Sequence, residues 1–87
     1  MIVYLHRNFK KQYRALSNER KKRFKERRNL FLKDPFHPLL HNHPLLGKHK
    51  GFRSINITGD LRVIYEPIKD NNIVLFIAIG THSALYE

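Results

Sequence analysis

The run IVLFIAI, residues 73–79, constrains the fold of this chain more than any other feature. It is apolar at every position and has the length of a β-strand, far short of a membrane span. A strand with two apolar faces is stable only where the protein covers it. We therefore expect this segment in the middle of a sheet.

Two further strands precede this run. Residues 52–58 and 61–66 alternate in side-chain character, and turn signals follow them at Gly59–Asp60 and at residues 69–72. Together with the apolar run they predict a three-strand antiparallel meander. Residues 2–5, IVYL, predict one more short strand.

The pattern between the first strand and the meander is helical. Asn8 can cap a helix over residues 8–16, and Ser17 or Asn18 can cap a second helix that runs to about residue 33. The short break between them predicts an antiparallel helical hairpin. Residues 1–87 are thus predicted to form a single α+β domain, with the hairpin packed on one sheet face and the other face free for a site.

Net charge is the strongest feature of the composition. Seventeen Lys and Arg oppose seven Asp and Glu, which gives a formal charge of +10. Such a surface attracts polyanions, so nucleic acid or an acidic protein is the expected partner. The absence of cysteine excludes disulfides and thiol catalysis and fits a reducing compartment. With neither a signal-peptide pattern nor an apolar span, we expect a cytoplasmic protein without a membrane partner.

Residues 37–51, HPLLHNHPLLGKHKG, hold four of the six histidines and are punctuated by proline and glycine, as expected of a loop. Zinc sites usually show ligand pairs at regular spacing, and the only carboxylate close by is Asp34. We therefore expect no metal and no other cofactor. Catalysis by a Ser–His–Asp set is also disfavoured, because neither Ser54 nor Ser83 lies in a nucleophile elbow.

Acid–base cleavage of RNA agrees better with the residues present. The reaction needs no protein nucleophile, since the 2′-OH attacks the adjacent phosphate. Histidine suits the two proton transfers, and arginine suits the phosphate. His43, Arg62 and His82 all lie near predicted strand ends, which can converge in a meander. Spacing alone leaves a structural alternative equally open, with His82 in a turn and Arg62 on a solvated strand.

The stretch HPLLGKHKGFRSINITGDLRVIYE, followed by GTHSALY, resembles the RelE/YafQ superfamily of bacterial toxins and is most similar to its YafQ branch. The resemblance is close over residues 43–86 and extends to the first forty residues only in layout. It implies a RelE-like fold and the toxin of a type II toxin–antitoxin system. Such a toxin is a metal-independent, ribosome-dependent mRNA endonuclease that inhibits translation and is neutralised by a cognate antitoxin, here expected to be acidic.

Four motif positions carry over from this resemblance. His43 matches the histidine of the HPL motif, and Asp60 matches the acidic residue after the second strand. His82 matches the histidine of the GTH motif and is implied to be the main proton-transfer residue. Tyr86 matches the terminal aromatic residue. The earlier HPLL, with His37 and His41, has no counterpart and is expected to be an approach loop.

One departure changes the implied site. Asn56 stands where the YafQ branch has a further histidine, and asparagine hydrogen-bonds but transfers no proton near neutrality. Arg62 stands where the RelE branch has its strand arginine. The resemblance therefore implies a mixed site, in which His82 transfers a proton and Arg62 contacts the phosphate.

Other residues near the predicted site are candidate RNA contacts. They are Lys48, His49, Lys50, Arg53, Asn56 and Tyr86. The basic run over residues 20–28 is either a solvated helix face or a grip on ribosomal RNA phosphates, which added salt would weaken.

Two rival functions remain at this point. The first is a ParE-like inhibitor of DNA gyrase, which shares the strand arginine but not the GTH ending. The second is a catalytically inactive domain that binds an antitoxin or regulates its own operon, a reading that Asn56 keeps open.

Overall fold

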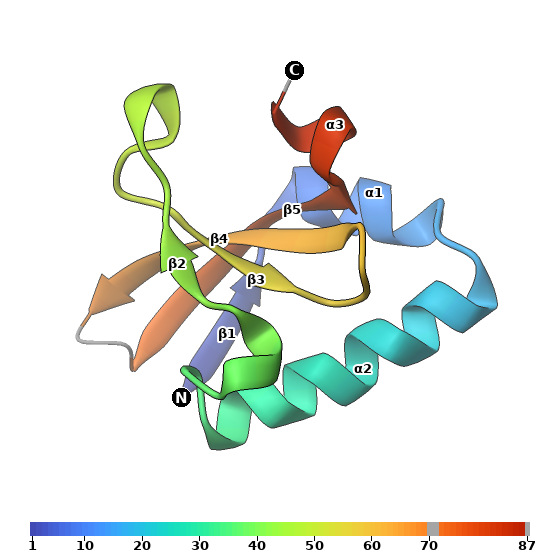
Figure 1. The fold of residues 1–87 in the computed structure, drawn as a ribbon, viewed down its shortest axis with the longest axis horizontal. Coiled ribbons are helices and arrows are strands. Elements are labelled where there is room, and N and C mark those ends of the chain that lie inside the picture. Colours follow the sequence, from blue (N-terminus) through green and yellow to red (C-terminus); the bar gives the residue numbers. More distant parts are fainter. Residues whose placement is uncertain (70–71, 87) are drawn as a thin grey trace.

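The computed structural model of the chain describes residues 1–69 and 72–86 (Figure 1). Its regular elements are β1 (Ile2–Leu5), α1 (Arg7–Arg14), α2 (Asn18–Lys33), β2 (His43–Pro44), β3 (Arg53–Asn56), β4 (Leu61–Lys69), β5 (Ile73–Thr81) and α3 (His82–Tyr86). Two short 3-10 turns, Pro38–Leu40 and Gly47–His49, flank β2. The helices of the described residues are all too short or too polar to cross a membrane.

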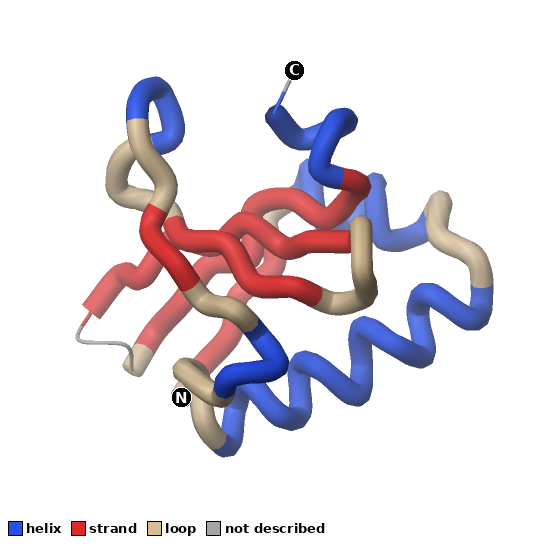
Figure 2. Tube along the Cα trace, viewed as in Figure 1, coloured by secondary structure: helices blue, strands red, loops and turns tan. Residues whose placement is uncertain are grey.

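The strands form one mixed sheet in the order β1-β5-β4-β3-β2 (Figure 2). The predicted meander of β3, β4 and β5 is confirmed, and β5 lies inside the sheet as expected. Two strands extend it. The amino-terminal β1 pairs in parallel with β5, and β2 pairs antiparallel with β3. The prediction of an unbroken loop over residues 37–51 was wrong here, because β2 and both 3-10 turns lie within it.

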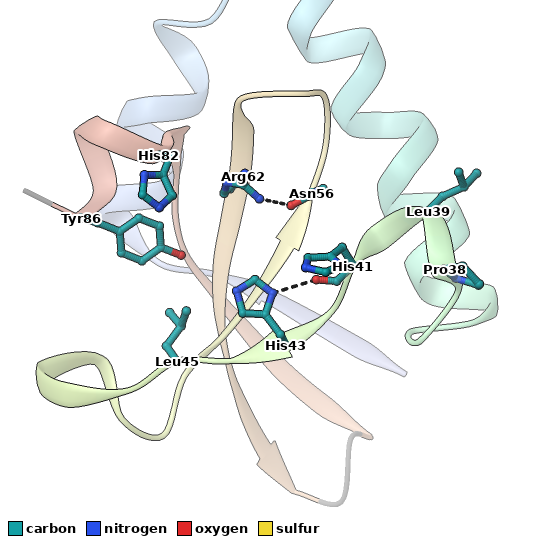
Figure 3. A pocket seen from close by; sticks show the side chains of 9 residues that line it. All are labelled: Pro38, Leu39, His41, His43, Leu45, Asn56, Arg62, His82 and Tyr86. Carbon is teal, nitrogen blue, oxygen red and sulfur yellow. Dashed lines mark hydrogen bonds between the residues drawn. The ribbon is translucent and has the colours of Figure 1, made fainter.

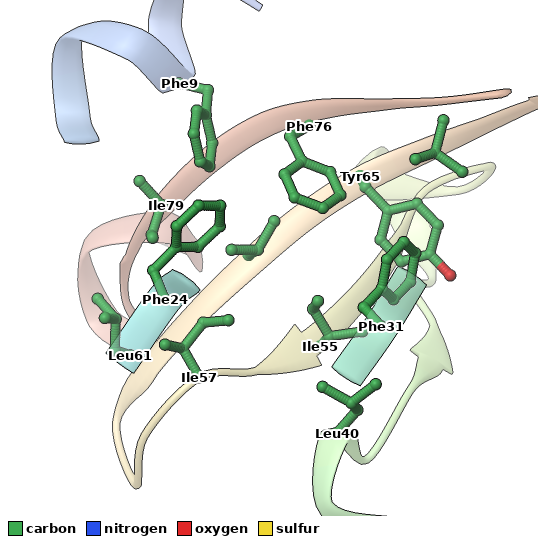
Figure 4. Close-up of a cluster of buried hydrophobic side chains, with 12 residues drawn as sticks. Phe9, Phe24, Phe31, Leu40, Ile55, Ile57, Leu61, Tyr65, Phe76 and Ile79 are labelled. Carbon is green, nitrogen blue, oxygen red and sulfur yellow. The ribbon is translucent and has the colours of Figure 1, made fainter. Parts of the chain in front are cut away.

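Both long helices pack on one face of the sheet through aromatic rings (Figure 4). Phe9 of α1 and Phe24 and Phe31 of α2 all lie within 6.0 Å, ring centroid to centroid, of Phe76 in β5. Phe31 also meets the ring of Tyr65 in β4 edge-on, at 5.1 Å. These side chains are at most 4% exposed, so they form the core that the predicted helical hairpin was expected to cover.

The helix boundaries agree closely with those predicted from the sequence, but the residue that caps α1 differs from the predicted one. Ser17 caps α2, as predicted. The cap of α1 is His6 and not Asn8, because the His6 ring accepts a hydrogen bond from the Asn8 backbone N–H. The Asn8 side chain instead donates to the carbonyl of Ile77.

The contact between Asn8 and Ile77 lies at an irregularity in the pairing of β5 with β4. Ile64 pairs with Ala78 and Tyr65 with Phe76, so Ile77 has no partner of its own in β4. A bulge of this kind removes backbone groups from the ladder. Side chains of α1 bond the β5 backbone beyond the end of its pairing with β1: Asn8 donates to the Ile77 carbonyl, and the Gln12 side-chain oxygen accepts from the Ile79 N–H at 2.9 Å.

The end of the described chain contains a helix that was not predicted. Residues 82–86 form α3, directly after β5. The predicted turn at residues 69–72 falls partly on residues 70 and 71, which lie outside the described residues, as does Glu87.

Candidate active site

A pocket of about 720 Å³ opens on the sheet face opposite the long helices. Its lining comes from the loop around β2, from β3 and β4, and from α3 (Figure 3). The lining residues are Pro38, Leu39, His41, His43, Leu45, Asn56, Arg62, His82 and Tyr86. Five of the residues predicted from the sequence are therefore brought together, although they are spread over more than forty positions of the chain.

Strand register explains the base of the pocket. Opposed residues of an antiparallel pair point to the same sheet face. Asn56 is paired with Arg62, and Arg62 is paired in turn with Gly80. Val63 and Tyr65 face the helices, so Arg62 faces the other way. The Arg62 guanidinium donates a hydrogen bond to the Asn56 side-chain oxygen, which fixes the direction of the positive charge.

Gly80 explains the position of α3. A Cβ atom at this residue would lie 3.3 Å from a methyl carbon of Leu85, so any larger side chain would crowd the face of α3 that packs on β5. Since Gly80 is paired with Arg62, the helix folds back beside that arginine. His82 and Tyr86, one turn apart, have ring centroids 4.7 Å from each other at the pocket rim. This is a physical reason for glycine in the GTH motif.

His43 lies on the opposite side of the pocket from α3 (Figure 3). Its backbone belongs to β2 and pairs with Ser54. The Nδ1 atom of His43 lies 2.9 Å from the carbonyl oxygen of His41. A carbonyl only accepts, so Nδ1 carries the proton in this contact and the neutral ring keeps Nε2 as its acceptor.

His41 also lines the pocket, although the sequence placed it only in the approach loop and not among the site residues. The residue adopts a left-handed backbone conformation, with φ of 45°, which closes the 3-10 turn before β2. Its ring centroid lies 5.2 Å from that of His43. The signal available in the sequence was the two-residue spacing between His41 and His43. His37, by contrast, caps the preceding 3-10 turn.

Several buried polar atoms around the pocket lack a hydrogen-bond partner among the described residues. They are Nε of Arg62, the hydroxyl of Tyr86 and Nε2 of His49. The His49 ring meets that of Tyr86 edge-on at 5.6 Å, so His49 lies behind the lining and not in it. Buried polar groups are normally paired. Unpaired donors at a pocket are consistent with a ligand that accepts hydrogen bonds.

Asp60 does not line the pocket. Its carboxylate lies 3.6 Å from Arg20 of α2 and its side chain is 63% exposed. Its backbone is closer to the site, because the Asp60 carbonyl accepts from the N–H of His82 at 3.2 Å. The turn that contains Asp60 therefore fixes the start of α3.

The remaining predicted RNA contacts divide into two groups. Lys48 and Lys50 are exposed beside the pocket in the loop after β2. Arg53 is half-buried elsewhere: its Nε donates to Asn42, and its guanidinium lies 5.3 Å from the centroid of the Phe36 ring. Within the described residues no three His, Asp or Glu side chains lie close enough together to hold a metal ion.

Comparison with solved structures defines the class of fold. The chain resembles YafQ of E. coli strain BL21(DE3), with a TM-score of 0.82 at 22% identity over 98% of this chain and 97% of that one. It also resembles a YoeB/ParE toxin from Agrobacterium tumefaciens, with a TM-score of 0.78 at 20% identity over 94% and 99%. A metal-bound toxin from Helicobacter pylori gives 0.73 at 25% identity over 99% of each chain. The fold is therefore that of small bacterial toxins.

The family follows from the sequence itself. The family described as the YafQ bacterial toxin of type II toxin–antitoxin systems matches residues 1–87. The chain therefore belongs to the YafQ toxin family, and the resemblance noted for residues 43–86 extends over its full length. A search of curated proteins gave no match.

Proposed function

We propose that this chain is the toxin of a type II toxin–antitoxin system and acts as a ribosome-dependent mRNA endonuclease. The observation that supports this most strongly is a single pocket lined by His43, His82 and Arg62 in a member of the YafQ family. Two imidazoles and a guanidinium are the groups that cleavage by an internal 2′-OH requires.

The proposed reaction uses each group once. The 2′-OH attacks the adjacent phosphorus and gives its proton to Nε2 of His43, the nitrogen left free by the contact with the His41 carbonyl. The bond from phosphorus to the 5′-oxygen breaks, and His82 donates a proton to that leaving oxygen. Arg62 stabilises the added charge on the phosphorane. No metal takes part in this scheme.

The surrounding residues bind and orient the RNA in this proposal. Asn56 directs Arg62, and Tyr86 offers a ring on which a base can stack. Asp60 holds the start of α3 through its carbonyl. The RNA phosphates are contacted in this proposal by Lys48 and Lys50, the exposed basic residues of the loop after β2. Arg53 and His49, also expected as RNA contacts, do not line the pocket, so they have no phosphate role here.

The partners follow from family and charge. A complex of E. coli YafQ with DinJ has been solved, and this chain matches the complex with a TM-score of 0.78 at 22% identity over 98% of this chain and 96% of that one. By analogy we propose a cognate antitoxin here. A charge of +10 favours an acidic partner and, in the cytoplasm, the ribosome and its mRNA.

The test is primer extension on a translated mRNA with purified ribosomes, comparing the parent with His82→Asn. Asparagine keeps a polar side chain but cannot transfer a proton, so we expect discrete cuts whose rate falls by about 10²–10⁴-fold in the variant. His6→Asn is the matched control. His6 caps α1 outside the pocket, and asparagine is a good capping residue, so this variant should cut like the parent.

Arg62→Ala separates the phosphate role from the proton role. Loss of a charge that stabilises the transition state lowers the rate by about 10²–10³-fold. An Arg62→Ala variant that cuts as fast as the parent would refute this role. Absence of cuts from the parent would instead favour gyrase inhibition or an inactive binding domain, and a DNA supercoiling assay would then decide between these two.

A further inference from the structure

Asn42 lies in the chain between His41 and His43, two of the histidines that line the pocket, and its side chain points away from both. Its side-chain nitrogen donates to the Pro35 carbonyl at 2.9 Å and to the Tyr65 hydroxyl at 2.8 Å. Its side-chain oxygen accepts from Nε of Arg53 at 2.8 Å. A single half-buried amide thus connects the loop that enters the pocket to β3 and β4.

The chemistry of the partners fixes which way this amide points. Arginine only donates and a backbone carbonyl only accepts, so the amide oxygen must face Arg53 and the nitrogen must face Pro35. The reversed orientation would break both contacts at once. Asn42 is therefore held in one orientation, with both of its N–H groups and its oxygen in use.

The anchor behind Asn42 is part of the core. Tyr65 is 1% exposed, and its ring lies against Phe31, with the hydroxyl at the edge of the cluster (Figure 4). Burial raises the pKa of Tyr65 above its ordinary value of 10.0, although the Asn42 contact and the Arg53 charge oppose this. The phenol therefore stays neutral at physiological pH and can accept from Asn42.

Backbone geometry passes this constraint to the histidines. Neighbouring residues of an extended segment point to opposite faces. Asn42 faces the helix side with Tyr65, so His43 faces the pocket, and the left-handed turn at His41 brings that ring into the pocket as well (Figure 3). The Asn42 side chain therefore adds a second attachment to the sheet beside the pairing of His43 with Ser54, and it lies directly between the two imidazoles in the chain.

We propose that Asn42 is a positioning residue of the active site, which sets the place and the proton-bearing nitrogen of His43 through its bonds to Tyr65, Arg53 and Pro35. This inference rests on the proposed function, since His43 is the base in that scheme. It also gives Arg53 a role that the sequence did not suggest, namely that of a fixed partner of Asn42. Asn42 itself touches no RNA in this proposal.

The test compares Asn42→Ala with the parent by two measurements. Long-range ¹⁵N correlation spectra of the imidazoles report, in the free protein, which nitrogen of each histidine carries the proton. Single-turnover cleavage on saturating ribosomes reports the chemical step separately from ribosome binding. Asn29→Ala is the matched control, because Asn29 is an exposed residue of α2 whose side chain, among the described residues, hydrogen-bonds to its neighbour Arg28 and to no other residue.

In Asn42→Ala we expect the His43 and His41 signals to shift or broaden and the His82 signals to stay in place. The cleavage rate should fall by about 10²-fold, the loss typical of a catalytic group displaced by about 1 Å, with ribosome affinity unchanged. The Asn29→Ala variant should match the parent in all these measurements. Tyr65→Phe removes only one of the bonds to Asn42, so it should give the same changes to a smaller extent.

Two results would overturn the proposal. One is a folded Asn42→Ala whose imidazole signals equal those of the parent. The other is an unchanged cleavage rate despite shifted signals. If the parent itself cuts no RNA but Asn42→Ala still shifts the His43 signals, the result would support the positioning role and refute the proposed function. If Asn42→Ala does not fold, Tyr65→Phe decides by the same criteria.

Discussion

Replacing each of the three serines of this chain by alanine should change stability in three different ways. Ser54 in β3 is 0% exposed, and its hydroxyl has no hydrogen-bond partner among the described residues. The Ser17 hydroxyl caps α2 by accepting from the Arg20 N–H at 3.2 Å. Ser83 lies exposed in α3. The same substitution thus removes a buried unpaired hydroxyl at Ser54, a hydrogen-bonded hydroxyl at Ser17 and a solvated hydroxyl at Ser83.

The structure sets the sign and size of each effect. Burying a hydroxyl without a partner is unfavourable by about 1–3 kcal/mol, and alanine removes this term. The packing lost with one oxygen is smaller than the about 0.5–1.5 kcal/mol lost when Ile becomes Val. We therefore expect Ser54→Ala to stabilise the fold by about 1 kcal/mol. Ser17→Ala should destabilise it by about 1 kcal/mol, and Ser83→Ala should stay within about 0.5 kcal/mol.

Urea unfolding at 25 °C measures all three variants, with the slope against urea checked for constancy so that only stability differs. In a thermal scan, 1 kcal/mol corresponds to about 4–8 °C in Tm for a domain of this size. The order of Tm should be Ser54→Ala, then the parent with Ser83→Ala, then Ser17→Ala. A Ser54→Ala variant less stable than Ser83→Ala would show that the Ser54 hydroxyl has a partner and would refute the reasoning.

Two further predictions concern the core. Gln12→Ala leaves the buried N–H of Ile79 without its acceptor and should lower the free energy of unfolding by about 1–3 kcal/mol in urea titration, with the exposed Asn29→Ala near zero. Tyr65 has a raised pKa in the folded state, so its contribution is complete below pH 10.0 and is lost as pH rises through the folded-state value. Stability measured from pH 8 to 11 should therefore fall more steeply in the parent than in Tyr65→Phe, and equal slopes would contradict the burial of this phenol.

The elements that could be predicted are those whose own side chains define them. The alternating and apolar runs gave β3, β4 and β5, and the cap at Ser17 with the proline after residue 33 gave α2. The bulge in β5 could not be predicted, because it arises from the pairing of β5 with β4 and the apolar run itself carries no signal for it. The two-residue strand β2 is equally invisible, since its pairing depends on β3 and not on its own sequence.

For the site, proximity in sequence was a poor guide to proximity in space. Arg53 was grouped with Lys48 and Lys50 as an RNA contact, yet strand alternation points it to the other face, where Asn42 holds it. Asp60 follows β3 directly, but its side chain turns toward Arg20. Whether a residue near the site in sequence reaches the pocket thus depends on which face of the sheet its side chain points to. His41 could not be placed for a similar reason. Its backbone is left-handed, a conformation usually indicated in a sequence by glycine or asparagine, and this position holds neither.

One strand connects the two halves of the pocket. Arg62 of β4 faces the pocket floor, while Tyr65, three residues further on, faces the core and holds Asn42 from behind. On the other side, Gly80 pairs with Arg62 and admits α3, which carries His82. The two sides of the pocket are therefore joined through β3 and β4, and the first half of β4 is mostly buried. Because β4 is paired with β3 on one side and with β5 on the other, the side chains on the two sides of the pocket share one packed strand as their support.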